Sequence, residues 1–258
     1  MRTALIGFTG FVGATLLRQA TFDDCYNSKN IEEIVGRQYD LVVCAGAPAV
    51  KWQANQQPQE DWANLQRLMQ ALQHVTAATF LLISTVDVYD PPVNVDEDTV
   101  IDPGNIHPYG KHRFLLEQFV RQQFARPHIV RLPGLFGHGL KKNFIYDLMH
   151  ANCLHLTHQD SAFQFYDLAQ LWDHLKIVRS NAVPLINFAT EPTSASELAA
   201  FCFGLEFHNE TERPPVRYDM HTKYAALFGR EAAYINSKEE TLTAIRRFVQ
   251  QQSRSAAL

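Results

Sequence analysis

The stretch Gly7-Phe-Thr-Gly-Phe-Val-Gly13 decides which fold we expect for this chain. It follows the aliphatic and β-branched run 3–6, and the apolar residues Val12, Leu16 and Leu17 recur at helical spacing. This order predicts a strand, a glycine turn and a helix. Glycine permits a close approach of the backbone and a helix N-terminus offers free N–H groups, as in loops that bind the pyrophosphate of a dinucleotide. A plain strand-to-helix turn is the alternative.

Strand and helix patterns alternate along the first half of the chain. Continuous apolar runs at 40–44, 79–83 and 128–132 are typical of strands buried on both faces of a parallel sheet. Helical spacing of apolar residues covers 60–75 and 109–124 between them. The alternation predicts an α/β protein with a Rossmann doubly wound parallel sheet.

Weaker patterns complete the expected fold. We expect further strands at 22–26 and 185–188, and further helices around 31–35, at 144–150, 168–180 and 241–251. The segment 45–59 reads as a loop, and its Gln-rich end at 53–59 reads as solvated surface.

The charge balance and hydropathy exclude several classes of partner. Lys and Arg number 23 against 27 Asp and Glu in 258 residues, which gives a net charge of −4 and no basic stripe. We therefore expect no nucleic-acid partner. No segment approaches the roughly 18 consecutive apolar residues that span a bilayer, and the start lacks the apolar core of a signal peptide. We expect no membrane association and a cytoplasmic protein.

Cysteine and histidine spacing gives no reason to expect a metal. The four cysteines show no CxxC pair, so we interpret them as reduced thiols rather than a disulfide framework or zinc ribbon. One cluster of potential ligands matches no zinc spacing; it comprises His150, Cys153, His155, His158 and Asp160.

Several short motifs, taken together, resemble those of one enzyme family. Besides the glycine loop, they are Ala45-Gly-Ala47, Ser84-Thr-Val-Asp-Val-Tyr89, Tyr109-Gly-Lys111, Arg131-Leu-Pro-Gly-Leu-Phe-Gly-His-Gly139, Phe163-Gln-Phe-Tyr-Asp-Leu168 and Asn187-Phe-Ala-Thr-Glu-Pro192. In this order they resemble the extended short-chain dehydrogenase/reductases, the NAD(P)-dependent nucleotide-sugar epimerases and dehydratases. The resemblance covers essentially the whole chain.

The resemblance implies a catalytic role for Tyr109, Thr85 and Arg113. Tyr109 matches the general acid/base, and Thr85 matches the hydroxyl that hydrogen-bonds the reacting oxygen. The family has a Lys four residues after the Tyr, which holds the nicotinamide ribose and lowers the phenol pKa, but this chain has Arg113 there. Lys111 points to another helix face and cannot replace it. The alternative is that Tyr109 and Arg113 merely cap and solvate a helix start.

The resemblance also implies the residues that bind the cofactor, NAD(P). They are Gly7, Thr9, Gly10, Phe11, Val12, Gly13, Asn27, Ser28, Lys29, Ala45, Gly46, Ala47 and Pro133. The predicted second strand ends at Asn27-Ser28-Lys29 without the carboxylate that usually holds the ribose of NAD, and Lys29 or Arg37 could meet a 2′-phosphate. NADP is therefore mildly favoured. Alternatively, Asn27 or Ser28 is an N-cap of the helix around 31–35.

The remaining implications concern the substrate and the domains. We expect Asp87, Lys142 and Asn143 to contact a small-molecule substrate, a nucleotide sugar. Residues 1–133 with a returning strand at about 183–190 form the expected dinucleotide-binding domain, and 134–182 and 191–258 form a small C-terminal substrate subdomain. A homodimer through the helices starting at Glu60 and Tyr109 would use Trp62 and Phe119.

These features lead to two hypotheses about function. In the first, the protein is an NAD(P)-dependent oxidoreductase, epimerase or dehydratase acting on a sugar by hydride transfer. In the second, it is a non-catalytic cofactor-binding sensor or assembly module. Arg113 distinguishes them, because an intact glycine loop with an altered ribose contact fits the second hypothesis.

Overall fold

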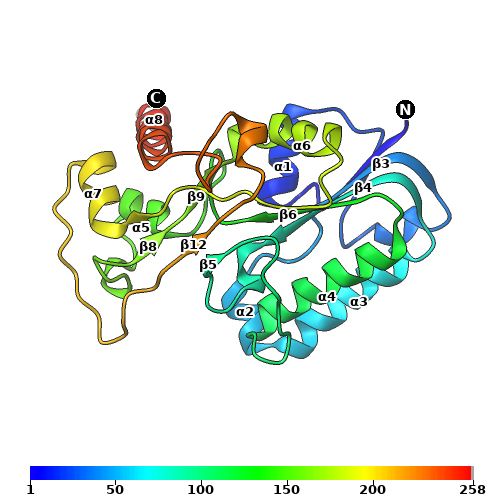
Figure 1. The fold of residues 1–258 in the computed structure, drawn as a ribbon, viewed down its shortest axis with the longest axis horizontal. Coiled ribbons are helices and arrows are strands. Elements are labelled where there is room, and N and C mark those ends of the chain that lie inside the picture. Colours follow the sequence, from blue (N-terminus) through cyan, green and yellow to red (C-terminus); the bar gives the residue numbers. More distant parts are fainter. Residues whose placement is uncertain (257–258) are drawn as a thin grey trace. The chain divides into compact units, whose positions relative to one another are not determined.

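A mostly parallel, six-stranded sheet forms the centre of the N-terminal half (Figure 1). The structure, a computed structural model, describes residues 1–256, with side chains up to residue 253. The strand order is β10-β6-β4-β3-β1-β2. The strands are β1 (Thr3–Ile6), β2 (Asp24–Tyr26), β3 (Gln38–Cys44), β4 (Thr76–Thr85), β6 (Pro127–Leu132) and β10 (Leu185–Asn187). The predicted fold class is confirmed.

Helices cover both faces of this sheet. Figure 1 shows α1 (Phe11–Gln19) and α6 (Leu171–Ser180) on one face and α3 (Pro58–Leu72) and α4 (Pro108–Gln123) on the other. Alternate residues of a strand point to opposite faces, so the buried side chains of β3 and β4 have a helix to pack against on either face. The face under α3 and α4 buries Val42, Cys44, Phe80, Leu82, Leu116 and Val120 in one core.

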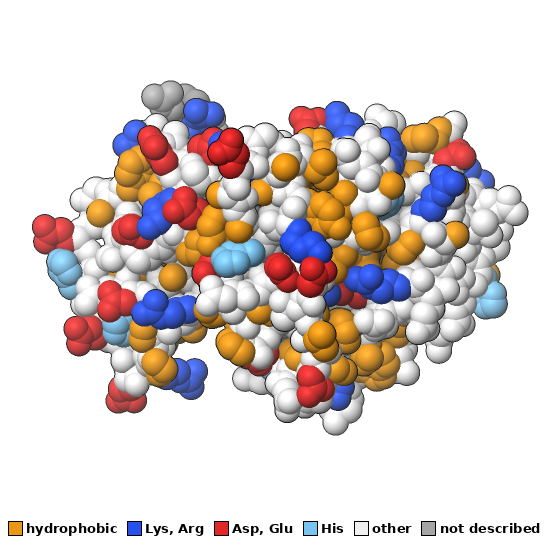
Figure 2. All heavy atoms as spheres, in the orientation of Figure 1, with side chains coloured by type: hydrophobic (Ala, Val, Ile, Leu, Met, Phe, Trp, Pro, Cys, Tyr) orange, Lys and Arg blue, Asp and Glu red, His pale blue; other side chains and the backbone are white. Residues whose placement is uncertain are grey.

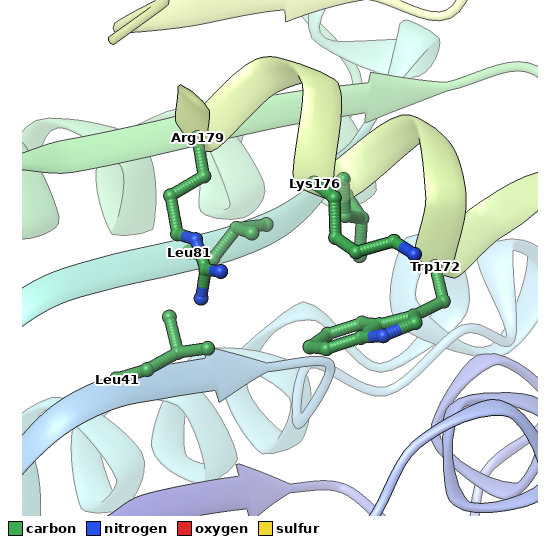
Figure 3. A pocket seen from close by; sticks show the side chains of 6 residues that line it. Leu41, Leu81, Trp172, Lys176 and Arg179 are labelled. Carbon is green, nitrogen blue, oxygen red and sulfur yellow. The ribbon is translucent and has the colours of Figure 1, made fainter. Parts of the chain in front are cut away.

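The opposite face closes tightly under α6. Trp172, Lys176 and Arg179 of this helix lie over Leu41 of β3 and Leu81 of β4 (Figure 3). The gap between them has no room for a water molecule. It is a packing seam in which the two cations lay their aliphatic stems on apolar surface.

The chain divides into two compact units that interleave in sequence. The first contains Met1–Asp90, Thr99–Leu132 and Gln170–Ile186, and the second contains Pro91–Asp98, Pro133–Ala169 and Asn187–Leu258. This division differs from the expected one at 170–182, which joins the first unit because α6 packs on the sheet. It also differs at 91–98, because β5 (Val93–Val95) pairs with β12 (Asp219–Met220) of the second unit.

The second unit has short strand pairs and three longer helices. Its other strands are β7 (Gly134–Phe136) paired with β9 (Phe165–Asp167), and β8 (Ala162–Phe163) paired with β11 (Thr193–Ser194). The helices α5 (Phe144–His150), α7 (Ala195–Phe203) and α8 (Lys238–Ala256) share one apolar core. The buried Gln164 amide ties distant segments together, because it donates to the carbonyls of Thr190 and Met220 and accepts from the Met220 N–H.

Two short elements differ from the expected pattern. The helix expected around 31–35 is a four-residue 3-10 helix, Ile31–Ile34. The expected loop at 45–59 contains a helix, α2 (Lys51–Gln56), and its last two residues already belong to α3. The 3-10 helix Ile31–Ile34 and α2 are too short for a period of 3.6 residues to show clearly in the sequence.

Two further features concern the helices and the surface charge of the described residues. Across residues 1–256, no helix has the length and apolar character needed to cross a bilayer. On the face drawn in Figure 2, acidic and basic side chains are interspersed. Trp62 and Phe119, expected at a dimer contact, are half-buried and pack against the core beneath α3 and α4. The homodimer stays a prediction.

Candidate active site

The glycine loop lies at the carboxyl end of β1, between β2 and β3. Ile6 pairs with Tyr26 on one side and with Cys44 on the other, so the segments that follow these three strands share one edge. The chain turns to opposite sides of β1 at this edge, which is the switch point where open α/β sheets bind ligands.

Two of the three glycines are required by the packing of the backbone. Gly7 has a φ of +85°, and a Cβ there would lie 2.2 Å from the carbonyl oxygen of Ala45. A Cβ at Gly13 would lie 2.0 Å from the carbonyl oxygen of Gly7. Gly46 is restricted too, since its Cβ would lie 2.9 Å from the Ile6 side chain. The loops 7–13 and 45–47 are therefore packed directly on each other.

Gly10 is different, because nothing inside the protein requires a glycine there. Its φ is −78°, and a Cβ would meet only the Gly7 carbonyl oxygen, at an ordinary 3.4 Å. It is the N-cap of α1, where no side chain accepts a hydrogen bond from the first turn. Thr9 and Gly10 are exposed, and Phe11 and Val12 are half-buried. An anion at this helix start would meet free N–H groups without obstruction by a side chain.

The turn after β2 offers hydroxyl and ammonium groups. Asn27 Oδ1 accepts from the Lys29 N–H at 2.8 Å, so the Asn27 side chain closes this turn. Ser28 and Lys29 are exposed. The N-cap of the helix Ile31–Ile34 is Asn30, so the N-cap alternative for Asn27 or Ser28 is wrong. Asp24 lies at the opposite end of β2 and binds Arg2 at 2.8 Å.

Thr85 and Tyr109 come together where β4 ends and α4 begins. Thr85 ends β4, and its hydroxyl accepts from the Asp87 N–H at 3.2 Å. The Thr85 hydroxyl is also close enough to the Tyr109 phenol to lower the pKa of that phenol. A close approach of α4 allows this contact, because a Cβ at Gly110 would lie 1.9 Å from the Asp87 carbonyl oxygen. His107 caps α4 by accepting from the Gly110 N–H at 3.2 Å.

Tyr109 titrates at higher pH than an ordinary tyrosine. Burial is the largest cause and raises the pKa of this phenol, and the Asp87 carboxylate raises it further. The charges of Arg113 and Lys51 and the nearby Thr85 hydroxyl lower the pKa, but by less than burial and Asp87 together raise it. The Arg113 charge thus acts in the direction that the family's Lys would, but the net effect of the surroundings is a raised Tyr109 pKa.

Arg113 is a buried, fully engaged side chain. It is 3% exposed, and its Nη1 and Nη2 donate to the two oxygens of Asp61 at 2.5 and 2.8 Å. Nη1 also donates to the Tyr109 carbonyl, and Nη2 to the Pro48 carbonyl. The guanidinium carbon lies 4.0 Å from the centre of the Tyr109 ring. The alternative that Arg113 merely solvates a helix start is therefore wrong. Its buried Nε has no hydrogen-bond partner and is the one guanidinium nitrogen left to bind a ribose.

A second buried ion pair fixes α4 on the sheet. Arg131 of β6 bonds Glu117 of α4, with Nη2 to Oε2 at 2.6 Å and Nε to Oε1 at 3.0 Å. Ser84 of β4 donates to the same carboxylate at 2.5 Å, and Arg131 also donates to the Tyr89 hydroxyl at 2.6 Å. This network joins the helix that carries Tyr109 to the strand that carries Thr85.

The structure adds site residues that sequence reasoning missed: Lys51, Asn55, Asp61 and His107. Lys51 Nζ lies 2.7 Å from Asp87 Oδ1, and Asn55 Oδ1 accepts from the Tyr109 N–H at 3.0 Å. Both come from α2, which the sequence did not predict. Their four-residue spacing would have placed them on one helix face had α2 been expected.

The expected substrate residues fall in different units. Asp87 lies beside Thr85 in the first unit, whereas Lys142 and Asn143 belong to the second, as does Pro133, which was expected at the cofactor. Asn143 has a φ of +109°; its Oδ1 accepts from the Tyr146 N–H at the start of α5, and its Nδ2 donates to the Leu135 carbonyl. Its side chain therefore already has structural partners. Lys142 is exposed.

Metal and thiol chemistry receive no support from the residues described. Over these residues no group of three or more His, Cys, Asp or Glu side chains is placed to hold a metal ion. Burial raises the pKa of Cys44 to about 11 and that of Cys202 to about 12, which makes both poor nucleophiles. Cys25 is half-buried and Cys153 is exposed.

Comparison with known families identifies the chain. The model of the NAD dependent epimerase/dehydratase family matches residues 21–178, more than half of the chain, and the match includes Thr85, Tyr109 and Arg113. The chain belongs to this family. A search among curated proteins finds no significant sequence match.

Solved structures with the same fold align with almost the whole chain. MoeE5 in complex with UDP-glucose and NAD is 16% identical, with 98% of this chain and 99% of that chain aligned and a TM-score of 0.75. The dTDP-4-dehydrorhamnose reductase of Bacillus anthracis in complex with NADP is 17% identical, with 97% and 98% aligned and a TM-score of 0.76. TunA, an NAD-dependent NDP-hexosamine 5,6-dehydratase, is 18% identical, with 97% and 98% aligned and a TM-score of 0.74.

The bidentate contact between Arg113 and Asp61 predicts a loss of stability on Arg113→Lys. An ammonium cannot bond both carboxylate oxygens and the Pro48 carbonyl in this geometry, so we expect a loss of about 1.5–3 kcal/mol in the free energy of unfolding. Urea denaturation measures it. The control is Arg67→Lys, whose exposed pair with Glu32 has the same chemistry at 2.7 Å and should change stability by less than about 1 kcal/mol. Equal losses in the two variants would contradict the structural role of Arg113.

Proposed function

We propose that this protein is an NAD(P)-dependent enzyme that oxidises and reduces a carbinol carbon of a nucleotide-linked sugar, as an epimerase, dehydratase or reductase. The observation that carries the proposal is Gly10. No contact inside the protein requires a glycine at this position. The absence of a side chain leaves the N-terminus of α1 accessible at the switch point of the sheet. Family membership and the contact between Thr85 and Tyr109 support the same reaction class.

The residues around this edge fit a dinucleotide. The loop 7–13 would hold its pyrophosphate by backbone N–H groups, residues 27–29 would meet the adenosine ribose, and Ala45, Gly46 and Ala47 would line the adjoining wall. Pro133, which directly follows β6, is proposed for the nicotinamide side. When bound, the cofactor supplies the acceptor and donor of hydride.

The protein's own residues would move the proton. Tyr109 takes the proton of the substrate hydroxyl during oxidation and returns it during reduction, while the Thr85 hydroxyl holds the reacting oxygen. Because burial raises the Tyr109 pKa, more of the phenol is protonated at neutral pH than in an exposed tyrosine. Oxidation, which needs the phenolate, should therefore become faster as the pH rises.

A nucleotide sugar is the substrate class that the neighbours suggest. MoeE5 is described with UDP-glucose or UDP-glucuronic acid, and a Thermotoga maritima UDP-glucose 4-epimerase of the same fold with UDP-glucose. In this chain we assign Asp87 to a sugar hydroxyl, and Lys142 and Asn143 to the diphosphate side. The exposed ammonium of Lys142 suits a phosphate.

The first prediction tests cofactor binding through Gly10→Val. The added isopropyl group should block the approach of a pyrophosphate and weaken NAD(H) and NADP(H) binding at least tenfold, with a stability change of about 1 kcal/mol or less. Calorimetric titration and urea unfolding measure the two effects. The control is Gly104→Val, an exposed glycine of the same unit. Wild-type protein that binds neither dinucleotide would refute the proposal.

The second prediction concerns the choice between NADP(H) and NAD(H). We propose that NADP(H) is preferred, because the turn 27–29 directly after β2 carries no carboxylate and Lys29 is exposed there. Lys29→Ala should weaken NADP(H) binding about ten- to a hundredfold, equivalent to about 1.5–3 kcal/mol, and leave NAD(H) unchanged. Arg37→Ala is the parallel variant and should have the smaller effect. Tighter NAD(H) binding by the wild type would show the preference to be wrong.

The third prediction tests the proton carrier through Tyr109→Phe. Without the phenol we expect turnover to fall by at least a hundredfold while dinucleotide binding persists. The measurement is hydride transfer or epimerised product with UDP- and dTDP-sugars. Tyr224→Phe, at a half-buried tyrosine that we place outside the site, should keep full activity. Unchanged turnover in Tyr109→Phe would exclude this proton carrier, and binding without turnover in the wild type would favour a sensor or assembly module.

A further inference from the structure

The segment 45–50 packs against the glycine loop but has no helix or strand of its own. It lies between β3 and α2, and all six of its residues are half-buried or exposed. Its start lies directly on the loop, because a Cβ at Gly7 would be 2.2 Å from the Ala45 carbonyl oxygen. Irregular segments of this kind fluctuate unless other parts of the fold hold them. The position of 45–50 therefore depends on contacts with the helices around it.

Arg113 of α4 provides such a contact at Pro48. Its Nη2 donates to the Pro48 carbonyl, while Asp61 of α3 accepts from Nη1 at 2.5 Å and from Nη2 at 2.8 Å. Arg113 and Asp61 have side-chain exposures of 3% and 5%, so the packed helices hold the guanidinium that reaches the exposed Pro48. A second contact comes from α2, where Asn55 accepts from the Tyr109 N–H at 3.0 Å. Figure 1 shows α2, α3 and α4 side by side.

We propose that Arg113 and Asp61 form a clasp that positions the segment 45–50, and through it the glycine loop, so that both are positioning residues for the dinucleotide. The inference rests on the proposed function in what the loop 7–13 binds. A guanidinium suits this role, because its planar fork reaches both Asp61 oxygens and the Pro48 carbonyl at once, whereas an ammonium is a single point charge.

Direct contact of Arg113 with the nicotinamide ribose is the alternative role. The geometry favours the clasp, because Nη1 and Nη2 of Arg113 are both engaged with protein oxygens and its Nε is buried. The two roles differ in what they do for a ligand that lacks this ribose. ADP is such a ligand, since it carries the adenosine and the pyrophosphate but no second ribose.

The clasp acts on affinity through pre-organisation. A segment that is already ordered in the free protein does not lose that ordering entropy when a ligand binds. Loss of the clasp should therefore weaken every ligand of the glycine loop, ADP included. Loss of a direct ribose contact should weaken the dinucleotides and leave ADP binding unchanged.

The first measurement is backbone hydrogen exchange in the free protein, which needs no ligand. In Arg113→Lys we expect the amides of 45–50 to exchange about fivefold faster or more, together with the Gly7 and Gly10 amides of the adjoining loop. The control is Val178→Ala, at a buried residue of α6 on the opposite face of the sheet (Figure 1). It lowers overall stability by leaving a cavity and should not speed exchange at 45–50 relative to the rest of the unit.

A double variant separates positioning from stability. Asp61→Leu combined with Arg113→Met replaces the buried pair by apolar side chains, a change that proteins often tolerate with little loss of stability. It also removes the contact with the Pro48 carbonyl. We expect urea unfolding close to that of the wild type, faster exchange at 45–50 and about three- to tenfold weaker ADP binding by calorimetry.

The outcomes distinguish the clasp from the ribose contact. Unchanged exchange at 45–50 in both variants, or faster exchange with unchanged ADP binding, would overturn the inference. Weaker dinucleotide binding with unchanged ADP binding would show that Arg113 contacts the nicotinamide ribose instead. Wild-type protein that binds neither ADP nor a dinucleotide would refute the proposed function, while the exchange measurement would still decide whether the clasp positions the segment.

Discussion

Glu117 and Arg131 form an ion pair with almost no access to solvent, and the placement of α4 on the sheet depends on it. Side-chain exposure is 0% and 2%, so each charge relies on the other and on Ser84 and Tyr89 for stabilisation. A buried pair of this kind adds little net stability, but removing one partner leaves an uncompensated charge and costs about 3–5 kcal/mol. The pair therefore selects one position of α4, and with it one position of Tyr109 relative to Thr85.

The environment of Tyr109 contains two ion pairs of different character. Arg113 and Asp61 are sealed beneath the ring, whereas Lys51 and Asp87 are partly exposed, with side-chain exposure of 40% and 16%. The sealed pair affects the site through packing, because Asp61 holds the Arg113 guanidinium against the Tyr109 ring. The Lys51–Asp87 pair remains in contact with solvent, so solvent and salt screen its charges more than those of the sealed pair.

The sequence predicted the sheet and the glycine loop because those features are local. The period of the strands and the position of Gly7 in a strand-to-helix turn can be read from neighbouring residues. The partner of Arg113 cannot, since Asp61 lies 52 residues away and meets it only when α3 packs beside α4. Lys51 was missed for another reason: the six residues of α2 are too few for a clear period. Likewise, the net direction of the Tyr109 pKa depends on burial, which is set by the fold.

The interleaving of the two units has a consequence for synthesis on the ribosome. The first unit takes Gln170–Ile186 as its last segment, so the edge of β6 has no β10 beside it until that segment leaves the exit tunnel. The second unit waits longer, because β5 in the N-terminal half pairs with β12 at Asp219–Met220. An unpaired strand edge can pair with another nascent chain. The first unit therefore cannot complete its sheet before residue 186 has emerged, and the second cannot complete its strand pairing before residue 220, so unpaired edges need protection during most of synthesis.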